Sequence, residues 1–333
     1  MIISKISANT IIGNVAYYCL LAEVAYQRHY YNSTGDVFLG ADSVRLPIEI
    51  IKRISNDILE DTLNSVFVLD FDGIENLQPN ADNEISDLRN IHKKVIVLAN
   101  IKESVVNQSA SFKYFIDANQ NYKEEDLNSY SFFSFGEIDC NLLSDCESIF
   151  LETFAAKLKR HLHNEIKYHH SSSVRISSYI DIKQLIAQEK PFVLFCIYRL
   201  ARKMRSRFDW KDNKPILICQ SLNGSYIASV LSLLLGLNLF VLDGIGPVNK
   251  LYPSLGSKII PGKRYLVVSD VVCLGTEVKI TKNIIEYLGG IYYGNVSIVR
   301  ISSFKDYNNV ESVFCINKNN KDDFNYRIIT PID

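Results

Sequence analysis

The stretch YLVVSDVVCLGTEVKITKNIIEYLGG, residues 265–290, decides the fold of the carboxy-terminal half. Its first residues, YLVV, predict a buried strand, and Ser269 and Asp270 stand at the carboxyl end of that strand. The loop Val271–Thr276 then leads into a helix, Glu277–Leu288, that a glycine pair ends. Backbone N–H groups, the threonine hydroxyl and the helix amino terminus can together hold a phosphate in such a loop. The stretch therefore predicts a strand, a loop and a helix that bind an anion.

A second turn of this kind lies upstream. Ile216–Cys219 predicts a strand, and the turn Gln220–Ser225 leads into a helix, Tyr226–Leu235, that Gly236 ends. From here the order is strand, turn, helix, strand, long loop, strand, loop, helix, strand, which is typical of a parallel sheet with crossover helices. We therefore expect an α/β fold with a parallel, Rossmann-like sheet and helices on both of its faces.

These segments resemble type I phosphoribosyltransferases. Residues 265–290 are similar to the phosphoribosyl pyrophosphate signature of that family, with the spacing of the orotate enzymes. The segment SSSVRISSYID, Ser171–Asp181, is similar to their substrate segment, and Gln220–Ser225 stands where the family keeps its pyrophosphate loop. The resemblance implies phosphoribosyl pyrophosphate or a nucleotide as the ligand. It also implies Mg²⁺ held through the bound diphosphate, without direct protein ligands.

The resemblance further implies roles for individual residues. The residues expected at the ribose and the 5′-phosphate are Ser269, Asp270, Cys273, Leu274, Gly275 and Thr276. Those expected at the diphosphate are Ser221, Asn223, Gly224 and Ser225. Those expected in the substrate segment are Ser172, Ser173 and Tyr179. Asp270 would hold the ribose hydroxyls during catalysis, with Lys250 or Lys258 at the leaving group.

Several positions depart from the family pattern. Ser269 replaces the first acidic residue, Cys273 replaces the first loop threonine, and Leu274 stands where a small or hydroxyl residue is usual. The segment Leu239–Lys263, where the family keeps its catalytic loop, contains lysines and no arginine. Its part Gly244–Gly262 is rich in turn residues, so we expect it to be mobile without ligand.

Two functions stay open at this point. One is a phosphoribosyltransferase, or a relative that cleaves an N-glycosidic bond through an oxocarbenium-like centre. The other is a catalytically weakened module that senses a nucleotide and docks a partner, as in a bacterial regulatory or defence system. The retained loop favours a ligand in both cases, and the altered positions favour the second.

The amino-terminal half carries its own α/β pattern, with a strand expected at Asp36–Gly40 and a helix over Pro47–Leu59. The residues VFVLDFDGIENLQPNADNEISDL followed by KKVIVLANI alternate strand and helix, and they resemble STAS-like domains over about residues 36–120. Signalling members carry a phosphorylated hydroxyl residue where this chain has Gln78–Ala81. The resemblance therefore implies docking of a partner or homodimerisation, without a phosphorylation switch. A plain structural α/β module is the alternative.

We expect the chain to divide into four parts, with a polar stretch, Asn119–Glu147, near the middle. The parts are a strand and helix extension at 1–35, the STAS-like domain at 36–145, a connecting helix at 146–170, and the phosphoribosyltransferase-like domain at 171–333. The apolar segment Thr10–Ala25 is interrupted by polar residues and is too short to span a bilayer, so we expect a packed helix there.

Composition limits the partners. The 36 basic and 37 acidic side chains nearly cancel, which argues against a general nucleic-acid coat. Seven scattered cysteines without a CxxC pair favour a reducing cytoplasm, and no membrane association is expected.

Three local features leave alternatives open. A histidine cluster could bind a metal, although no cysteine or paired carboxylate accompanies it; its members are His161, His163, His169 and His170. A cationic run is either a solvated helix end or a surface for nucleic acid or a phosphorylated partner; its members are Arg199, Arg202, Lys203, Arg205 and Arg207. Cys273 is either a space-filling replacement for threonine or a reactive thiol.

Overall fold

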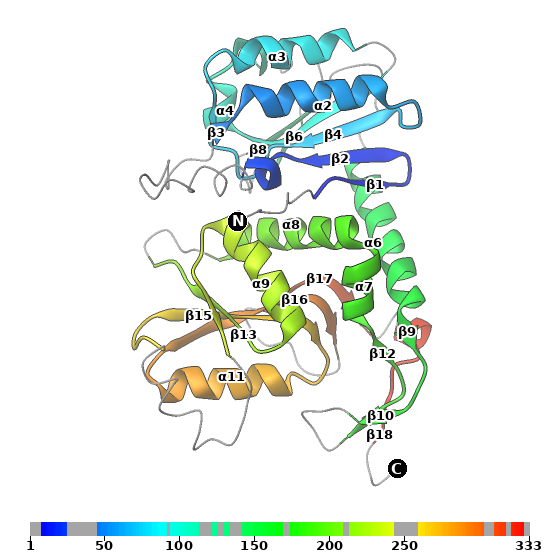
Figure 1. Cartoon of the computed structure of the whole chain (residues 1–333), viewed down its shortest axis with the longest axis vertical. Helices are drawn as coiled ribbons and strands as arrows, with labels where there is room; N and C mark the ends of the chain where they lie inside the picture. The colour runs from blue at the N-terminus through cyan, green and yellow to red at the C-terminus, as the bar shows by residue number, and fades with distance from the viewer. Residues whose placement is uncertain are drawn as a thin grey trace. The chain divides into compact units, whose positions relative to one another are not determined.

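The protein is described by a computed structural model that covers residues 8–24, 45–91, 94–112, 122–124, 129–133, 142–168, 174–208, 213–242, 259–302, 310–317 and 321–329. The chain divides into two compact units, Met1–Thr153 and Phe154–Asp333 (Figure 1). The boundary falls inside α6, Leu142–Arg160. Within the described ranges, no helix combines the length and the apolar character that a membrane span needs.

The amino-terminal unit contains a six-stranded mixed sheet in the order β1-β2-β4-β6-β8-β7. Strands β2, β4 and β6 run parallel, and β1, β8 and β7 pair antiparallel at the two edges. The strands are β1 Thr10–Ile12, β2 Val15–Cys19, β4 Val66–Asp70, β6 Val95–Lys102, β7 Tyr122–Glu124 and β8 Ser129–Phe133. The short strands β3 Arg45–Leu46 and β5 Asn76–Leu77 form a separate parallel pair. The helices are α2 Ile48–Glu60, α3 Ala81–Asp87, the 3-10 turn η2 Leu88–Asn90, and α4 Glu103–Val106.

Helix α2 packs on this sheet through an isoleucine face. Ile50, Ile54 and Ile58 recur at helical spacing and are buried. They belong to the same core cluster as Phe67 of β4 and Leu98 of β6. The helix predicted over Pro47–Leu59 is present, but its contact face is this isoleucine face, and Leu59 lies outside it with 61% of its surface exposed.

The expectation of a helix over Thr10–Ala25 is wrong. The segment forms a β1–β2 hairpin around Gly13, which has φ +62°, and its helical part begins only at Leu20. A glycine in the left-handed region suits a tight turn, and β2 then pairs in register with β4. These pairings place β1 and β2 in one sheet with β4. The strand expected at Asp36–Gly40 lies outside the described residues.

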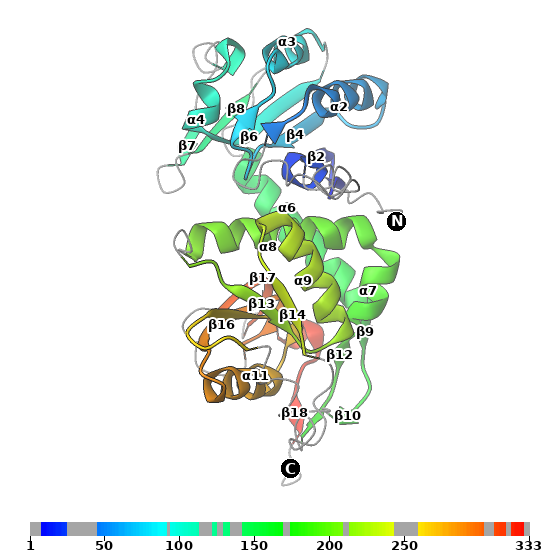
Figure 2. The same cartoon turned by 60° about the vertical axis from the view of Figure 1, so that its left-hand side comes forward.

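The carboxy-terminal unit contains a five-stranded parallel sheet in the order β14-β13-β15-β16-β17. The strands are β13 Ile216–Cys219, β14 Leu239–Val241, β15 Arg264–Val272, β16 Ile291–Ile301 and β17 Val310–Ile316. Helices α8 Lys190–Arg207 and α9 Leu222–Leu235 lie on one side of this sheet, and α11 Thr276–Tyr287 lies on the other (Figures 1 and 2). The expected α/β class, with helices on both faces of a parallel sheet, is confirmed.

Apolar residues on one face of the sheet form the core under α11. Tyr265 and Val267 of β15 pack with Ile218 of β13 and with Ile285 of α11. Gly290 lies against this core, because a Cβ added there would be 2.9 Å from Ile285 Cγ2 and 3.0 Å from the Tyr265 ring. The glycine pair that ends α11 therefore allows a close approach of backbone to core.

Short strands join the carboxy-terminal segment to residues 162–180. They are β9 Leu162–His163, β10 Lys167–Tyr168, β11 Arg175–Ile176, β12 Tyr179–Ile180 and β18 Ile328–Ile329. β11 pairs with both β10 and β18, and β12 pairs with β9. The segment continues into α7, Ile182–Gln188, where the Asp181 side chain accepts from Gln184 N and caps the helix. A 3-10 turn, η4 Asp322–Phe324, precedes β18.

Cationic side chains at the end of α8 contact other residues of the carboxy-terminal unit. Lys203 Nζ donates to Ser312 O of β17 at 3.0 Å, and Arg207 pairs with Glu311 of the same strand. The Arg199 guanidinium lies 5.9 Å from the Phe195 ring centroid. These contacts favour a structural use of the run over a surface for nucleic acid.

We expect Gly290→Ala to destabilise the protein by about 1–3 kcal/mol, because the new methyl group would displace the fully buried Tyr265 ring. Urea unfolding with Ser229→Ala as the control, an exposed change on α9, would measure the effect. Equal unfolding midpoints for the two variants would contradict the close packing at Gly290.

Candidate functional site

The phosphate-type loop is shorter than the sequence predicts. β15 continues to Val272 and pairs with β16, so Asp270 is not its last residue. The loop is the short segment 273–275, and α11 begins at Thr276. Gly275 is the N-cap with φ +71°, and no side chain among the described residues caps the helix. The first N–H groups of a helix have no acceptor within the helix, so the donors at this end point out of the helix.

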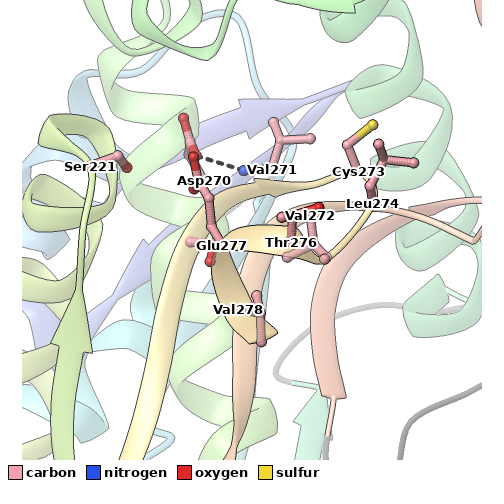
Figure 3. A pocket seen from close by; sticks show the side chains of 11 residues that line it. Ser221, Asp270, Val271, Val272, Cys273, Leu274, Thr276, Glu277 and Val278 are labelled. Atoms are coloured by element: carbon pink, nitrogen blue, oxygen red, sulfur yellow. Dashed lines mark hydrogen bonds between the residues drawn. The ribbon is translucent and has the colours of Figure 1, made fainter. Parts of the chain in front are cut away.

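A cavity of about 200 Å³ lies at this end of α11 (Figure 3). It is lined by Ser221 and by the consecutive residues Ser269 to Val278. In Figure 3, Ser221 lies on one side of Asp270, and Cys273 and Leu274 lie on the other. The position agrees with a general rule for open parallel sheets, in which ligands bind beyond the carboxyl ends of the strands where the strand order reverses. Here that point lies between β13 and β15.

The carboxylate of Asp270 is fixed in orientation. Asn223 Nδ2 donates to Asp270 Oδ2 at 2.8 Å, and the Val271 N–H donates to Oδ1 at 2.9 Å. Asp270 is half-buried and lines the cavity. A carboxylate held in this way can accept hydrogen bonds from hydroxyl groups of a ligand without losing further side-chain conformational entropy.

The turn expected over Gln220–Ser225 is largely the first turn of α9. Ser221 is the N-cap, and its Oγ accepts from Gly224 N at 2.9 Å. Gly224 is buried, and a Cβ there would be 2.9 Å from Ser221 Oγ and 3.2 Å from the Val268 carbonyl oxygen. Ser225 Oγ donates to Leu222 O at 2.7 Å. Ser221 therefore borders the cavity, Asn223 acts through Asp270, and Gly224 allows α9 to approach β15.

Ser269 borders the cavity from inside the sheet. It is 8% exposed, and Asn295 Nδ2 contacts its Oγ at 3.4 Å and the Val267 carbonyl oxygen at 3.1 Å. An aspartate at this position would place a second carboxylate in a buried setting, which is costly without a cation. The serine therefore fits the packing, and Ser269→Asp would need a compensating cation.

Cys273 contacts the carboxy-terminal segment. Its thiol shares a short hydrogen bond with the Tyr326 hydroxyl. Burial raises the pKa of the Cys273 thiol and also the pKa of the Tyr326 hydroxyl. A raised thiol pKa lowers the thiolate fraction, so the structure favours the space-filling hypothesis over a reactive thiol.

A second cavity of about 190 Å³ adjoins the first, since Asp270, Val271 and Cys273 line both. Its other walls come from β12, from the ends of β16 and β17, and from the carboxy-terminal segment; they include Tyr179, Ile180, Ile301, Ile316, Phe324 and Tyr326. Tyr179, predicted from the substrate segment, is thus near the predicted loop. Lys250, Lys258, Ser172 and Ser173 lie outside the described residues, as does most of the segment Gly244–Gly262.

Glu277 and Tyr326 line the cavities but were not predicted as site residues from the sequence. Glu277 is exposed and follows Thr276 directly, so its place in the first turn of α11 could have been noticed from the sequence. Tyr326 meets Cys273 across 53 residues, and no local pattern indicates that contact.

Within the described ranges, no three His, Cys, Asp or Glu residues gather as a metal site would require. His161 is 4% exposed with Nδ1 3.5 Å from Gln184 Oε1, and His163 stacks on Tyr179 at 4.8 Å. Both histidines thus have structural contacts, while His169 and His170 lie outside the described residues.

No protein-family model matches the chain, and no curated protein matches it in sequence. Similar solved structures include adenine phosphoribosyltransferase from Thermoanaerobacter pseudethanolicus, 15% identical over 48% of this chain and 98% of that chain, with a TM-score of 0.35. Orotate phosphoribosyltransferase from Aeropyrum pernix is 18% identical over 49% of this chain and 93% of that chain, also with a TM-score of 0.35. Orotate phosphoribosyltransferase from Mycobacterium tuberculosis, in complex with inorganic phosphate, is 17% identical over 50% of this chain and 96% of that chain, again with a TM-score of 0.35. At TM-scores this low, a function has to rest on the geometry of the cavities themselves.

We expect Gly224→Ala to disturb the site without unfolding the protein, because the new methyl group would push α9 away from β15 at Val268 O. The shift would lengthen the Asn223–Asp270 hydrogen bond. Amide chemical shifts of Asn223 and Asp270 would report it, with Ser229→Ala as the control on the same helix. Unchanged shifts at both residues would contradict a close approach at Gly224.

We expect iodoacetamide to label Cys273 slowly at pH 7.5, and faster as the pH rises, because burial raises the pKa of this thiol. Mass spectrometry of peptides from native and urea-unfolded protein would measure the ratio of rates. A native rate equal to or above the unfolded rate would show an activated thiol.

Proposed function

We propose that the first cavity binds the ribose 5-phosphate part of a ligand such as phosphoribosyl pyrophosphate or a nucleotide. The observation that carries the proposal is the uncapped start of α11 at Thr276, which forms a wall of the cavity. N–H groups that point out of the first turn and the positive end of the helix dipole favour a phosphate there. The Thr276 hydroxyl supplies a further donor.

Asp270 is proposed to hold the ribose hydroxyls. Its carboxylate lines the same cavity and is oriented by Asn223 at 2.8 Å. Charge-assisted hydrogen bonds from hydroxyl groups are worth roughly 1.5–3 kcal/mol each. A phosphate site and a fixed carboxylate at one strand end together suit a sugar phosphate better than a free phosphate ion.

A diphosphate with its magnesium ion would fit on the side of Ser221 and the first turn of α9. Two carboxylates, Asp270 and Glu277, line the cavity, so a bare diphosphate would be repelled. A Mg²⁺ ion bound to the diphosphate would reduce this repulsion, since carboxylate oxygens and waters are its usual ligands. We therefore propose that the ion arrives with the ligand.

The proposed reaction is displacement at ribose C1. The bond from C1 to the leaving group breaks as the bond to an acceptor forms, and the leaving group departs with the bonding electrons. Lys250 or Lys258 is proposed to neutralise the leaving group, and Asp270 to hold the ribose during the oxocarbenium-like transition state. The acceptor would approach from the side of the second cavity, which shares Asp270 with the first.

A second candidate function is nucleotide sensing without turnover. The observation that favours it is Ser269, buried beside Asn295 where the family has an acidic residue. In this case the amino-terminal unit is proposed to dock a protein partner or a second copy of the chain. Nucleic acid is not favoured as a partner, because the cations at the end of α8 contact β17.

Pyrophosphate release separates the two functions. An enzyme incubated with phosphoribosyl pyrophosphate, Mg²⁺ and a panel of acceptors releases pyrophosphate continuously. A sensor raises its melting temperature with the same ligand by mass action but releases none. If no ligand of the panel causes pyrophosphate release or a higher melting temperature, both functions are contradicted.

We expect Asp270→Asn to weaken binding of ribose 5-phosphate by about tenfold or more, because the neutral amide loses charge-assisted hydrogen bonds. Thr276→Val should weaken 5′-phosphorylated ligands and barely affect free nucleosides. Glu277→Gln should strengthen binding of ribose 5-phosphate without Mg²⁺, since it removes a negative charge from the cavity wall.

Isothermal titration calorimetry would measure these affinities. Asp87→Asn and Thr62→Val, exposed changes in the other unit, are matched controls. Unchanged affinity in both Asp270→Asn and Thr276→Val would place the ligand elsewhere and contradict the proposed function.

A further inference from the structure

The second cavity has apolar walls. Ile301 ends β16 and Ile316 ends β17, and Phe324 comes from the carboxy-terminal segment. Ile180 of β12 adds another aliphatic wall. These four side chains offer a ligand no hydrogen-bonding group, so any polar recognition must come from the remaining lining residues.

The polar side chains among the described lining residues are already engaged. Ser178 Oγ donates to Phe324 O at 2.9 Å, and the Tyr326 hydroxyl is bonded to the Cys273 thiol. The Tyr179 hydroxyl accepts from Lys167 Nζ at 2.6 Å. Asp270 accepts from Asn223 and from the Val271 N–H, and its remaining acceptor sites face the ribose in the proposed function. The described walls therefore offer the edge of a nucleobase only the remaining capacity of these hydroxyl groups, such as the Tyr179 O–H.

The walls are held in place by the carboxy-terminal segment. Ser177 Oγ donates to Asn325 O at 2.6 Å and accepts from Arg327 N at 2.8 Å. Phe324 is 1% exposed and packs against Phe314 with ring centroids 6.0 Å apart. A ligand in the cavity thus meets preformed apolar surface, which keeps the ordering cost of binding low.

We propose that the second cavity takes an apolar ring attached to ribose C1, in place of a nucleobase that needs hydrogen bonds. The inference rests on the proposed function, because the ribose 5-phosphate in the first cavity sets where C1 lies. The volume suits one ring, since a cavity of about 150 Å³ lined by Leu, Ile and Phe is enough to bind benzene, and this one measures about 190 Å³.

The preference follows from desolvation. Burying a ring against aliphatic and aromatic walls strengthens binding by roughly tenfold to a hundredfold. A pyrimidine in the same place would lose water from several N–H and C=O groups and recover few partners, which cancels much of that gain. The apolar ring is therefore the better occupant.

Three ligands test the inference by calorimetry. They are ribose 5-phosphate, uridine 5′-monophosphate, and the C-nucleoside 1-phenyl-ribose 5-phosphate, all without Mg²⁺. We expect the phenyl compound to bind roughly ten- to a hundredfold more tightly than ribose 5-phosphate, with uridine 5′-monophosphate close to ribose 5-phosphate.

Two variants test whether the tighter binding of the phenyl compound arises in the second cavity. Ile180→Ala should reduce the ratio of phenyl to ribose 5-phosphate affinity by about three- to tenfold, because it removes apolar wall. Ile166→Ala, an exposed change near β10, should leave the ratio as it is.

The outcomes separate the two proposals. Failure of ribose 5-phosphate to bind would contradict the proposed function itself. If ribose 5-phosphate binds but uridine 5′-monophosphate binds more tightly than the phenyl compound, the proposed function stands and the apolar preference is overturned. Equal binding of all three ligands, or an unchanged ratio in Ile180→Ala, would also overturn it.

Discussion

The carboxy-terminal unit depends on the reversal of strand order between β13 and β15. These strands lie side by side and parallel, but the chain leaves β13 toward β14 and leaves β15 toward β16. Their following helices, α9 and α11, therefore lie on opposite faces and begin at the same edge of the sheet (Figure 2). This edge gathers helix amino termini and strand-end side chains without any sequence motif being required.

Contacts between neighbouring elements at this edge of the sheet shape the two cavities. Gly224 lets α9 approach β15, and Asn223 then reaches Asp270. On the far side, Tyr326 contacts Cys273 and brings the carboxy-terminal segment against the loop. The first cavity carries the carboxylates of Asp270 and Glu277, while apolar side chains form most of the second. A ligand of the proposed kind would place its phosphate in the first cavity and an apolar group in the second.

The sequence was most informative where local chemistry and tertiary role agree. β15, the loop and α11 could be predicted in kind, because the apolar run YLVV and Gly275 carry local signals, but β15 extends to Val272 and shortens the loop. The hairpin at residues 10–19 could not be predicted, because its apolar residues suit a helix as well as strands. Only the pairing of β2 with β4 determines that the segment forms strands. The sequence predicts an open turn where the first turn of α9 lies, because Ser221 and Gly224 favour a turn and a helix start equally. Tyr326 and Phe324 reach the site through β11–β18 pairing, a long-range contact with no local pattern.

The proposed ligand site depends on a phosphate at the start of α11, and a titration can locate that phosphate directly. Titration of the full chain with ribose 5-phosphate, followed through backbone amide chemical shifts, would show which N–H groups receive the phosphate. We expect the largest shifts at Gly275, Thr276 and Glu277, with smaller ones at Asp270 and Asn223. Saturable shifts confined to other residues, with the start of α11 unchanged, would contradict it.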